Sequence, residues 1–125
     1  MQGKAHNPGF LALVQDAKSR VREIDIPGYQ RMRESGEDHV LVDVREDEEW
    51  RAGHAAGAIH LGKGVIERDI EKMIPDKSAR LVLYCGGGYR SALAADAIQR
   101  MGYGNVFSLD GGWRGWRDAG LPTEV

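Results

Sequence analysis

Cysteine is nearly absent from this sequence: Cys85 is the only one among 125 residues. An internal disulfide and a zinc site built from several cysteines are therefore excluded. The chain also lacks a second thiol that could resolve an intermediate formed on Cys85. Any redox or transfer chemistry at Cys85 must therefore end on another molecule.

Long runs of a single residue class are missing as well. No stretch of 18 or more apolar residues occurs, so we expect no membrane-spanning segment. No long basic run occurs and the formal net charge is -2, which argues against nucleic acid as a partner. The apolar piece at residues 10–14 is too short for a secretory signal. These absences predict a cytoplasmic protein that binds neither nucleic acid nor a membrane.

Glycine, by contrast, is abundant, with 17 residues, about twice the ~7% share that is typical of proteins. Most of these glycines stand at the ends of short apolar or helical patterns, as punctuation between elements rather than as a linker. The length suits one domain of common size, and no repeat or clear domain boundary interrupts it.

Short apolar runs alternate with helical patterns along the chain. Buried strands are predicted at residues 39–44 and 80–84, shorter strands at 57–61 and 105–109, and an edge strand at 22–26. Helices are predicted at residues 28–35, 46–53, 64–74, 91–102 and 112–120. The alternation predicts an α/β domain with a mostly parallel sheet and helices on both faces. Ligands of such sheets bind at the carboxyl ends of the strands, where Cys85 falls.

The segment CGGGYRS, residues 85–91, connects the 80–84 strand to a helix that we expect to begin near Ser91. Three glycines allow positive φ and a tight turn, so that successive N–H groups can point at one spot and bind an anion. The N-terminus of the following helix adds a partial positive charge there. A thiol in these surroundings ionises more readily than a free cysteine. The alternative, a small buried hydrophobe at Cys85, leaves the three glycines unexplained.

Two reactions fit an activated cysteine beside an anion site: phosphoryl transfer through a phosphocysteine and sulfur transfer through a persulfide. Cysteine phosphatases, as a family, have five residues between the cysteine and the arginine, whereas four separate Cys85 from Arg90. The shorter loop suits one extra sulfur atom better than a phosphoryl group. The side chain of Arg90 either lines this site, since guanidinium suits anions, or points outward, or holds an acidic neighbour.

Three stretches of the chain resemble the rhodanese family of sulfurtransferases, and they occur in the family's order. CGGGYRS is similar to the family's active loop, with Cys85, Gly88 and Arg90 in the matching places. Residues 41–61 resemble its upstream motif and residues 109–122 its C-terminal motif. The resemblance implies a rhodanese-like fold with about five strands over residues 22–125. Residues 1–21 lie outside it and are predicted to form an N-terminal helical extension.

The same resemblance implies a two-step sulfur transfer. Cys85 attacks the outer sulfur of a small anionic donor such as thiosulfate, and the resulting persulfide passes its sulfur to cyanide or to a thiol, including one on an acceptor protein. The residues expected to bind the anionic sulfur are Gly86, Gly87, Gly88, Tyr89, Arg90 and Ser91. No metal or organic cofactor is expected. Many thiosulfate-using members have a basic residue at the place of Gly86, and glycine there resembles relatives that use mercaptopyruvate, so the donor stays open.

Asp43 and Arg45 end the 39–44 strand at the same edge of the sheet and are candidate supporting residues. Asp43 either binds the loop or acts as an acid, or it is a structural carboxylate that pairs with an arginine. Arg45 is expected to reach Glu49 in a weak surface ion pair.

Four other side chains are expected to be mainly structural. His54 and His60 are six residues apart and lack a complete ligand set for a metal. Trp113 and Trp116 are expected in the core, with Trp113 also a candidate for a wall of the pocket. Tyr89 is expected at the pocket entrance.

Two alternatives to a sulfurtransferase remain open. The first is a small cysteine-dependent phosphatase or arsenate reductase. The second is a non-catalytic module that carries a persulfide or binds a partner. The presence of Cys85 argues against pure binding, because inactive relatives often lack that cysteine.

Overall fold

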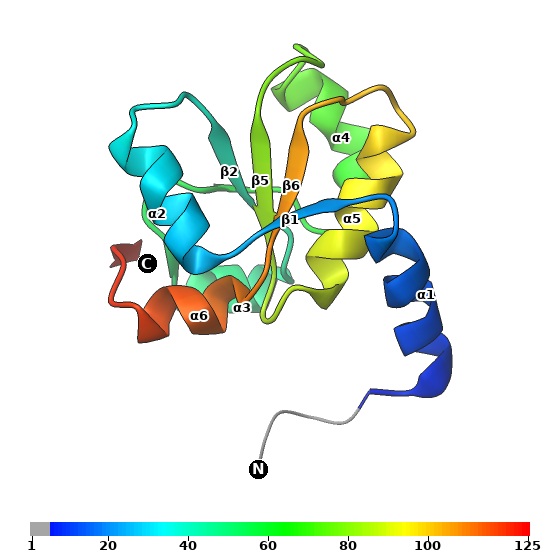
Figure 1. Cartoon of the computed structure of the whole chain (residues 1–125), viewed down its shortest axis with the longest axis horizontal. Coiled ribbons are helices and arrows are strands. Elements are labelled where there is room, and N and C mark those ends of the chain that lie inside the picture. Colours follow the sequence, from blue (N-terminus) through cyan, green and yellow to red (C-terminus); the bar gives the residue numbers. More distant parts are fainter. Residues whose placement is uncertain (1–5) are drawn as a thin grey trace.

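A computed structural model describes residues 6–125 (Figure 1), so residues 1–5 of the expected N-terminal extension lie outside the described part. Its centre is a five-stranded sheet in the order β1-β6-β5-β2-β4, in which all neighbours are parallel. The strands are β1 (Arg22–Ile24), β2 (Val40–Asp43), β4 (Ile59–His60), β5 (Leu81–Tyr84) and β6 (Val106–Leu109). The predicted fold class, a mostly parallel sheet of about five strands, is confirmed.

Helices cover both faces of this sheet. They are α1 (Pro8–Lys18), α2 (Ile26–Glu34), α3 (Asp47–Ala52), α4 (Ile66–Met73), α5 (Tyr89–Gln99) and α6 (Gly112–Asp118). In Figure 1, α4 and α5 lie on one side of the sheet, and α2 and α6 on the other. Two clusters of buried side chains match these two sides, one with Ile66, Ile70 and Ile98, the other with Tyr29 and Trp116.

The structure of strand β5 explains why residues 81–84 do not alternate between apolar and polar side chains. Leu81 and Leu83 join the cluster under α4 and α5, while Val82 and Tyr84 join the cluster under α2 and α6. Successive side chains of a strand point to opposite faces, and here both faces are covered. Full burial of a Leu or Val side chain contributes about 1.5–3 kcal/mol. The carboxyl end of this central strand, where Cys85 follows, is therefore rigidly placed.

Helix α1 packs along α5 on the outer side of the domain (Figure 1). Val14 and Ala17 are buried in this contact. Arg20, just after the helix, donates two hydrogen bonds of 2.9 and 2.8 Å to the carboxylate of Asp96 on α5. The described part of the N-terminal extension is thus docked against the domain.

Two local features differ from the sequence-based expectation. Helix α5 begins at Tyr89 rather than near Ser91, because Gly88, with a φ of 109°, caps the helix directly after the turn. A second, antiparallel sheet pairs β3 (His54–Ala55) with β7 (Thr123–Glu124). Strands of two residues carry no periodic signal, so this sheet was not predicted. Among residues 6–125, no helix has the length and apolar character needed to cross a membrane.

Candidate active site

The sulfur of Cys85 lies where β5 ends and the loop to α5 begins. Its side chain is only 1% exposed. The backbone N–H of Gly88 donates a hydrogen bond of 3.1 Å to Sγ, and Oγ of Ser91 lies 3.5 Å from it. Gly88 adopts the left-handed conformation that makes this inward turn, which favours glycine over other residues.

These contacts control the ionisation of Cys85. Burial raises the pKa of the thiol, but hydrogen bonds to the sulfur from the side chain and backbone of Ser91 and from the backbones of Gly88 and Gly87 lower it more. The pKa of Cys85 is therefore below its ordinary value. A larger fraction of the thiol is ionised near neutral pH than in a free cysteine, and the thiolate is the nucleophilic form.

A second serine, Ser108, forms a hydrogen bond with Ser91. Oγ of Ser108, fully buried on β6, lies 2.8 Å from Oγ of Ser91. A thiolate can only accept hydrogen bonds, so with Cys85 ionised both hydroxyls point the same way: Ser108 donates to Ser91, and Ser91 donates to Sγ. Ser108 was not predicted as a site residue; the only signal is a polar residue within the apolar strand 106–109.

The first turn of α6 holds the loop from the other side. The backbone N–H of Trp113 donates to the carbonyl oxygen of Cys85 at 2.7 Å, and that of Arg114 to the carbonyl oxygen of Gly86 at 3.2 Å. Gly112 lets the helix come this close, because a Cβ there would lie 2.4 Å from the carbonyl oxygen of Cys85. The loop carbonyls thus bind α6, which leaves N–H groups of the same turn free to bind the sulfur.

A cavity of about 520 Å³ opens beside Cys85. It is lined by His6, Phe10, Glu49, Cys85, Gly86, Gly87, Tyr89, Arg90 and Arg114. The lining is mixed in character, with two guanidinium groups, one carboxylate and three ring side chains. Tyr89, expected at the entrance, is part of it.

Arg90 fulfils both of the roles that its sequence position left open. It lines the cavity, and its Nη1 and Nη2 bind the carboxylate oxygens of Glu49 at 2.8 and 3.2 Å. The hydrogen bonds from Arg90 lower the pKa of Glu49. The pKa of Arg90 is raised by Glu49 and, against the opposing effect of burial, by the negative charge of the Cys85 thiolate.

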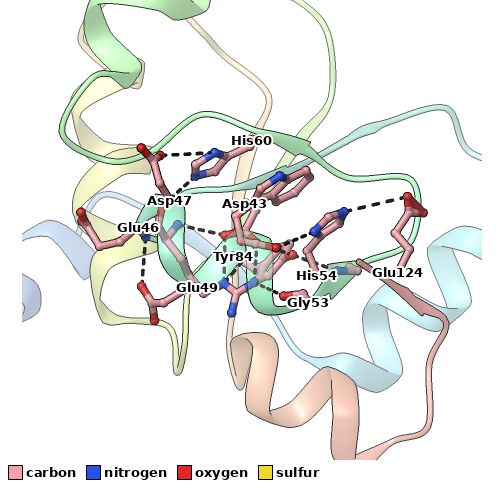
Figure 2. Close-up of polar contacts among 12 residues, drawn as sticks. Asp43, Glu46, Asp47, Glu49, Gly53, His54, His60, Tyr84 and Glu124 are labelled. Atoms are coloured by element: carbon pink, nitrogen blue, oxygen red, sulfur yellow. Dashed lines mark hydrogen bonds and ion pairs between the residues drawn. The ribbon is translucent and has the colours of Figure 1, made fainter.

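Asp43 and Arg45 form a buried pair, and neither lines this cavity. Figure 2 draws the polar contacts around Asp43, with Tyr84 and Gly53 beside it. Nη2 of Arg45 donates to the Asp43 carboxylate at 2.7 Å and to the carbonyl oxygen of Gly53 at 2.7 Å. The hydroxyl of Tyr84 donates to the same carboxylate at 2.6 Å and accepts from the backbone N–H of Ala55 at 3.0 Å. Asp43 is therefore placed as a structural carboxylate paired with an arginine.

The expected ion pair between Arg45 and Glu49 is wrong. Arg45 is 3% exposed and turned inward to Asp43, while Glu49 binds Arg90. A fully buried carboxylate needs a cation and several hydrogen bonds, so it holds Arg45 more strongly than an exposed acid does.

The two histidines both stack on the indole of Trp50, with ring centroids 3.3 Å away for His54 and 5.0 Å away for His60. Nδ1 of His54 lies 2.8 Å from the carbonyl oxygen of Trp50, and Nε2 of His60 lies 2.8 Å from that of Arg45. Within residues 6–125, no cluster of three or more His, Cys, Asp or Glu side chains is arranged to hold a metal ion. Stacking and backbone contacts thus account for both rings.

The two tryptophans of the C-terminal motif have different surroundings. Trp116 is buried in the core, as expected. Trp113 is partly buried, and its indole lies under the guanidinium of Arg45 at 4.7 Å. Trp113 is not part of the lining of the Cys85 cavity. Four residues that do line it were not predicted, namely His6, Phe10, Glu49 and Arg114.

Comparison with known proteins agrees with this geometry. The family model for the rhodanese-like domain matches residues 28–119. Thiosulfate sulfurtransferase GlpE of Vibrio cholerae is 33% identical over 102 residues, which cover 82% of this chain and 93% of that protein. The resemblance to rhodaneses found in the three sequence motifs is thereby confirmed.

Solved structures show the same fold. A Rhodopseudomonas palustris structure, described as a protein of unknown function and possible tyrosine phosphatase, superposes with a TM-score of 0.84 at 32% identity, covering 99% of this chain and 100% of that one. Thiosulfate sulfurtransferase from Pseudomonas aeruginosa shares the fold with a TM-score of 0.78 at 21% identity, over 92% of this chain and 22% of that one. With its three motifs, its parallel sheet and the match over residues 28–119, this chain belongs to the rhodanese-like domain family.

Proposed function

We propose that this protein is a sulfurtransferase that carries a sulfane sulfur on Cys85 as a persulfide. The observation that carries the proposal is the surroundings of Sγ, which receives a hydrogen bond from the N–H of Gly88, lies 3.5 Å from Oγ of Ser91 and has a lowered pKa. The same groups suit a persulfide, because its terminal sulfur is also an anion. The similarity to a thiosulfate sulfurtransferase supports this reaction class.

The reaction consists of two displacements at sulfur. The Cys85 thiolate attacks the outer sulfur of an anionic donor such as thiosulfate, a new S–S bond forms, and sulfite leaves with the electrons of the broken bond. A thiolate, including one on an acceptor protein, or cyanide then attacks the terminal sulfur, and Cys85 leaves as a thiolate. Arg90 and Arg114 provide positive charge where the anionic donor enters.

A second candidate is a cysteine-dependent phosphatase, which the description of the Rhodopseudomonas palustris structure favours. The loop argues for sulfur, because only four residues separate Cys85 from Arg90 and the turn closes tightly around one sulfur atom.

The two candidates are separated by assaying one preparation for both activities. We expect thiocyanate from thiosulfate or mercaptopyruvate plus cyanide, no release of phosphate from an aryl phosphate, and no thiocyanate with Cys85→Ser. Phosphate release that depends on Cys85, without thiocyanate, would establish the phosphatase instead. A persulfide that forms but passes to no small acceptor would indicate a carrier.

A further inference from the structure

Three ring side chains form one wall of the Cys85 cavity, and two of them come from the N-terminal segment. The ring of His6 lies 4.6 Å from that of Tyr89 and 5.4 Å from that of Phe10, and Phe10 lies 6.2 Å from Tyr89. Nζ of Lys18 stands 5.1 Å from the centre of the Tyr89 ring. We call His6, Phe10 and Tyr89 the aromatic wall.

The aromatic wall is fixed in place by the rest of α1. Val14 and Ala17 are 2% and 1% exposed where the helix packs on α5, and Arg20 is bound to Asp96. Both His6 and Phe10 lie outside residues 28–119, which match the family model. Two of the three rings of the wall are therefore contributed from outside the matched residues, and they line the same cavity as Cys85.

The lining of the cavity also contains two guanidinium groups, those of Arg90 and Arg114. Arg90 is engaged by Glu49, whereas Arg114 forms no ion pair with any carboxylate among residues 6–125. Its backbone N–H is bound to the loop carbonyl of Gly86, and its Nη1 lies 4.0 Å from where a Cβ on Gly87 would be, so the guanidinium is next to the loop. The lining of one cavity thus combines the aromatic wall, a guanidinium that forms no ion pair among residues 6–125, and Cys85.

The size of the cavity exceeds what an inorganic sulfur anion requires. A volume of about 520 Å³ falls within the ~300–1,000 Å³ range of sites for small organic ligands. Thiosulfate and cyanide offer no apolar surface for Phe10 and Tyr89 to contact. An organic substrate with both an anionic group and an apolar body would use both the guanidinium and the rings of the lining.

We propose that the aromatic wall selects the sulfur acceptor, which is an organic thiol with a carboxylate on an apolar, ring-containing body. The carboxylate pairs with Arg114, and the apolar body lies on Phe10 and Tyr89. The thiolate then attacks the outer sulfur of the Cys85 persulfide. A new S–S bond forms, the bond to Cys85 breaks, and the products are the organic persulfide and the Cys85 thiolate. This inference rests on the proposed sulfur transfer.

The test compares two acceptors on one loaded enzyme. The full chain is loaded with thiosulfate, freed of excess donor, and discharged with either 4-mercaptobenzoate or cyanide, while intact mass follows the loss of sulfur. The variable is the ratio of the two second-order rate constants. Phe10→Ala is compared with Leu13→Ala, an apolar side chain on the same helix that is 62% exposed and outside the cavity lining.

We expect the ratio of 4-mercaptobenzoate to cyanide rates to fall at least about fivefold in Phe10→Ala, since a lost aromatic contact is worth this much. Leu13→Ala keeps the wild-type ratio. Tyr89→Leu, which removes a second ring of the wall, lowers the ratio in the same sense. An unchanged ratio in both wall variants, with loading and cyanide discharge intact, overturns this inference alone. If the wild type takes up no sulfur from any donor, the proposed function fails and the inference falls with it.

Discussion

Gly112 offers the sharpest test of how the active loop is held. A methyl group at this position would lie 2.4 Å from the carbonyl oxygen of Cys85 and 2.9 Å from the carbonyl carbon of Gly86. Both neighbours are backbone atoms, so no side chain can move aside to relieve the overlap. Gly112→Ala must therefore push the first turn of α6 and the loop apart.

The cost of this substitution follows from two contributions. Gly112 has a φ of 50°, and placing alanine in the left-handed region costs about 1–2 kcal/mol. Separation of α6 from the loop weakens the hydrogen bonds that Trp113 and Arg114 donate, each worth about 0.5–1.5 kcal/mol. The free energy of unfolding should fall by about 2–5 kcal/mol, a large share of the ~5–15 kcal/mol typical of a domain.

Gly120→Ala is the matched control for urea denaturation and for the rate of persulfide loading. Gly120 has a φ of 72°, but no atom lies within 4 Å of where its Cβ would be. The free energy of unfolding of Gly120→Ala should fall only by the cost of placing alanine in the left-handed region, about 1–2 kcal/mol, and this variant should take up sulfur at the wild-type rate. Gly112→Ala should lose more stability and load more slowly. Equal stability losses and equal rates of persulfide loading in the two variants would refute the role of the close contact between α6 and the loop.

Three further substitutions probe separate parts of the site. Ser91→Ala removes the side-chain hydrogen bond that lowers the pKa of Cys85. Alkylation of Cys85 by iodoacetamide should therefore reach its half-maximal rate at a higher pH and be about tenfold slower near pH 7. An unchanged pH profile would contradict this role of Ser91. Arg114→Ala should raise the KM for thiosulfate about tenfold. Arg117→Ala is the control, because it removes the same charge from the same helix outside the cavity, and it should leave this KM unchanged. Equal effects of the two substitutions would mean that only the overall charge matters. Asp43→Asn leaves the buried guanidinium of Arg45 without its carboxylate and should lower the free energy of unfolding by about 3–5 kcal/mol. The folded fraction should still take up sulfur from the donor at the wild-type rate. Slow uptake of sulfur in a stable variant would instead give Asp43 a catalytic role.

The sheet and the loop were predictable because each has a local cause. Residues 40–42 and 81–84 are short, largely buried apolar runs, and parallel order follows from helices between the strands. The three glycines after Cys85 predict a turn, and one of them, Gly88, has a positive φ. After this loop, the start of α5 was misplaced by one or two residues, since a glycine cap lets the helix begin at once.

The cavity was not predictable because its walls come from distant segments. Phe10, Glu49 and Arg114 belong to α1, α3 and α6, and no local pattern says that these meet at Cys85. The partner of Arg45 was missed for another reason. Glu49, on the following helix, was expected as a surface partner, although Asp43 is nearer in the chain. Asp43 is buried and also accepts a hydrogen bond from the hydroxyl of Tyr84, and it holds the guanidinium inside.

The most direct test of the central proposal is the intact mass of the protein after incubation with thiosulfate or with mercaptopyruvate, beside a Cys85→Ser control. A persulfide on Cys85 predicts a gain of one sulfur atom in the wild type, none in the variant, and removal of that sulfur by cyanide with release of thiocyanate. An unchanged mass with both donors, in a protein whose thiol still alkylates, would contradict it.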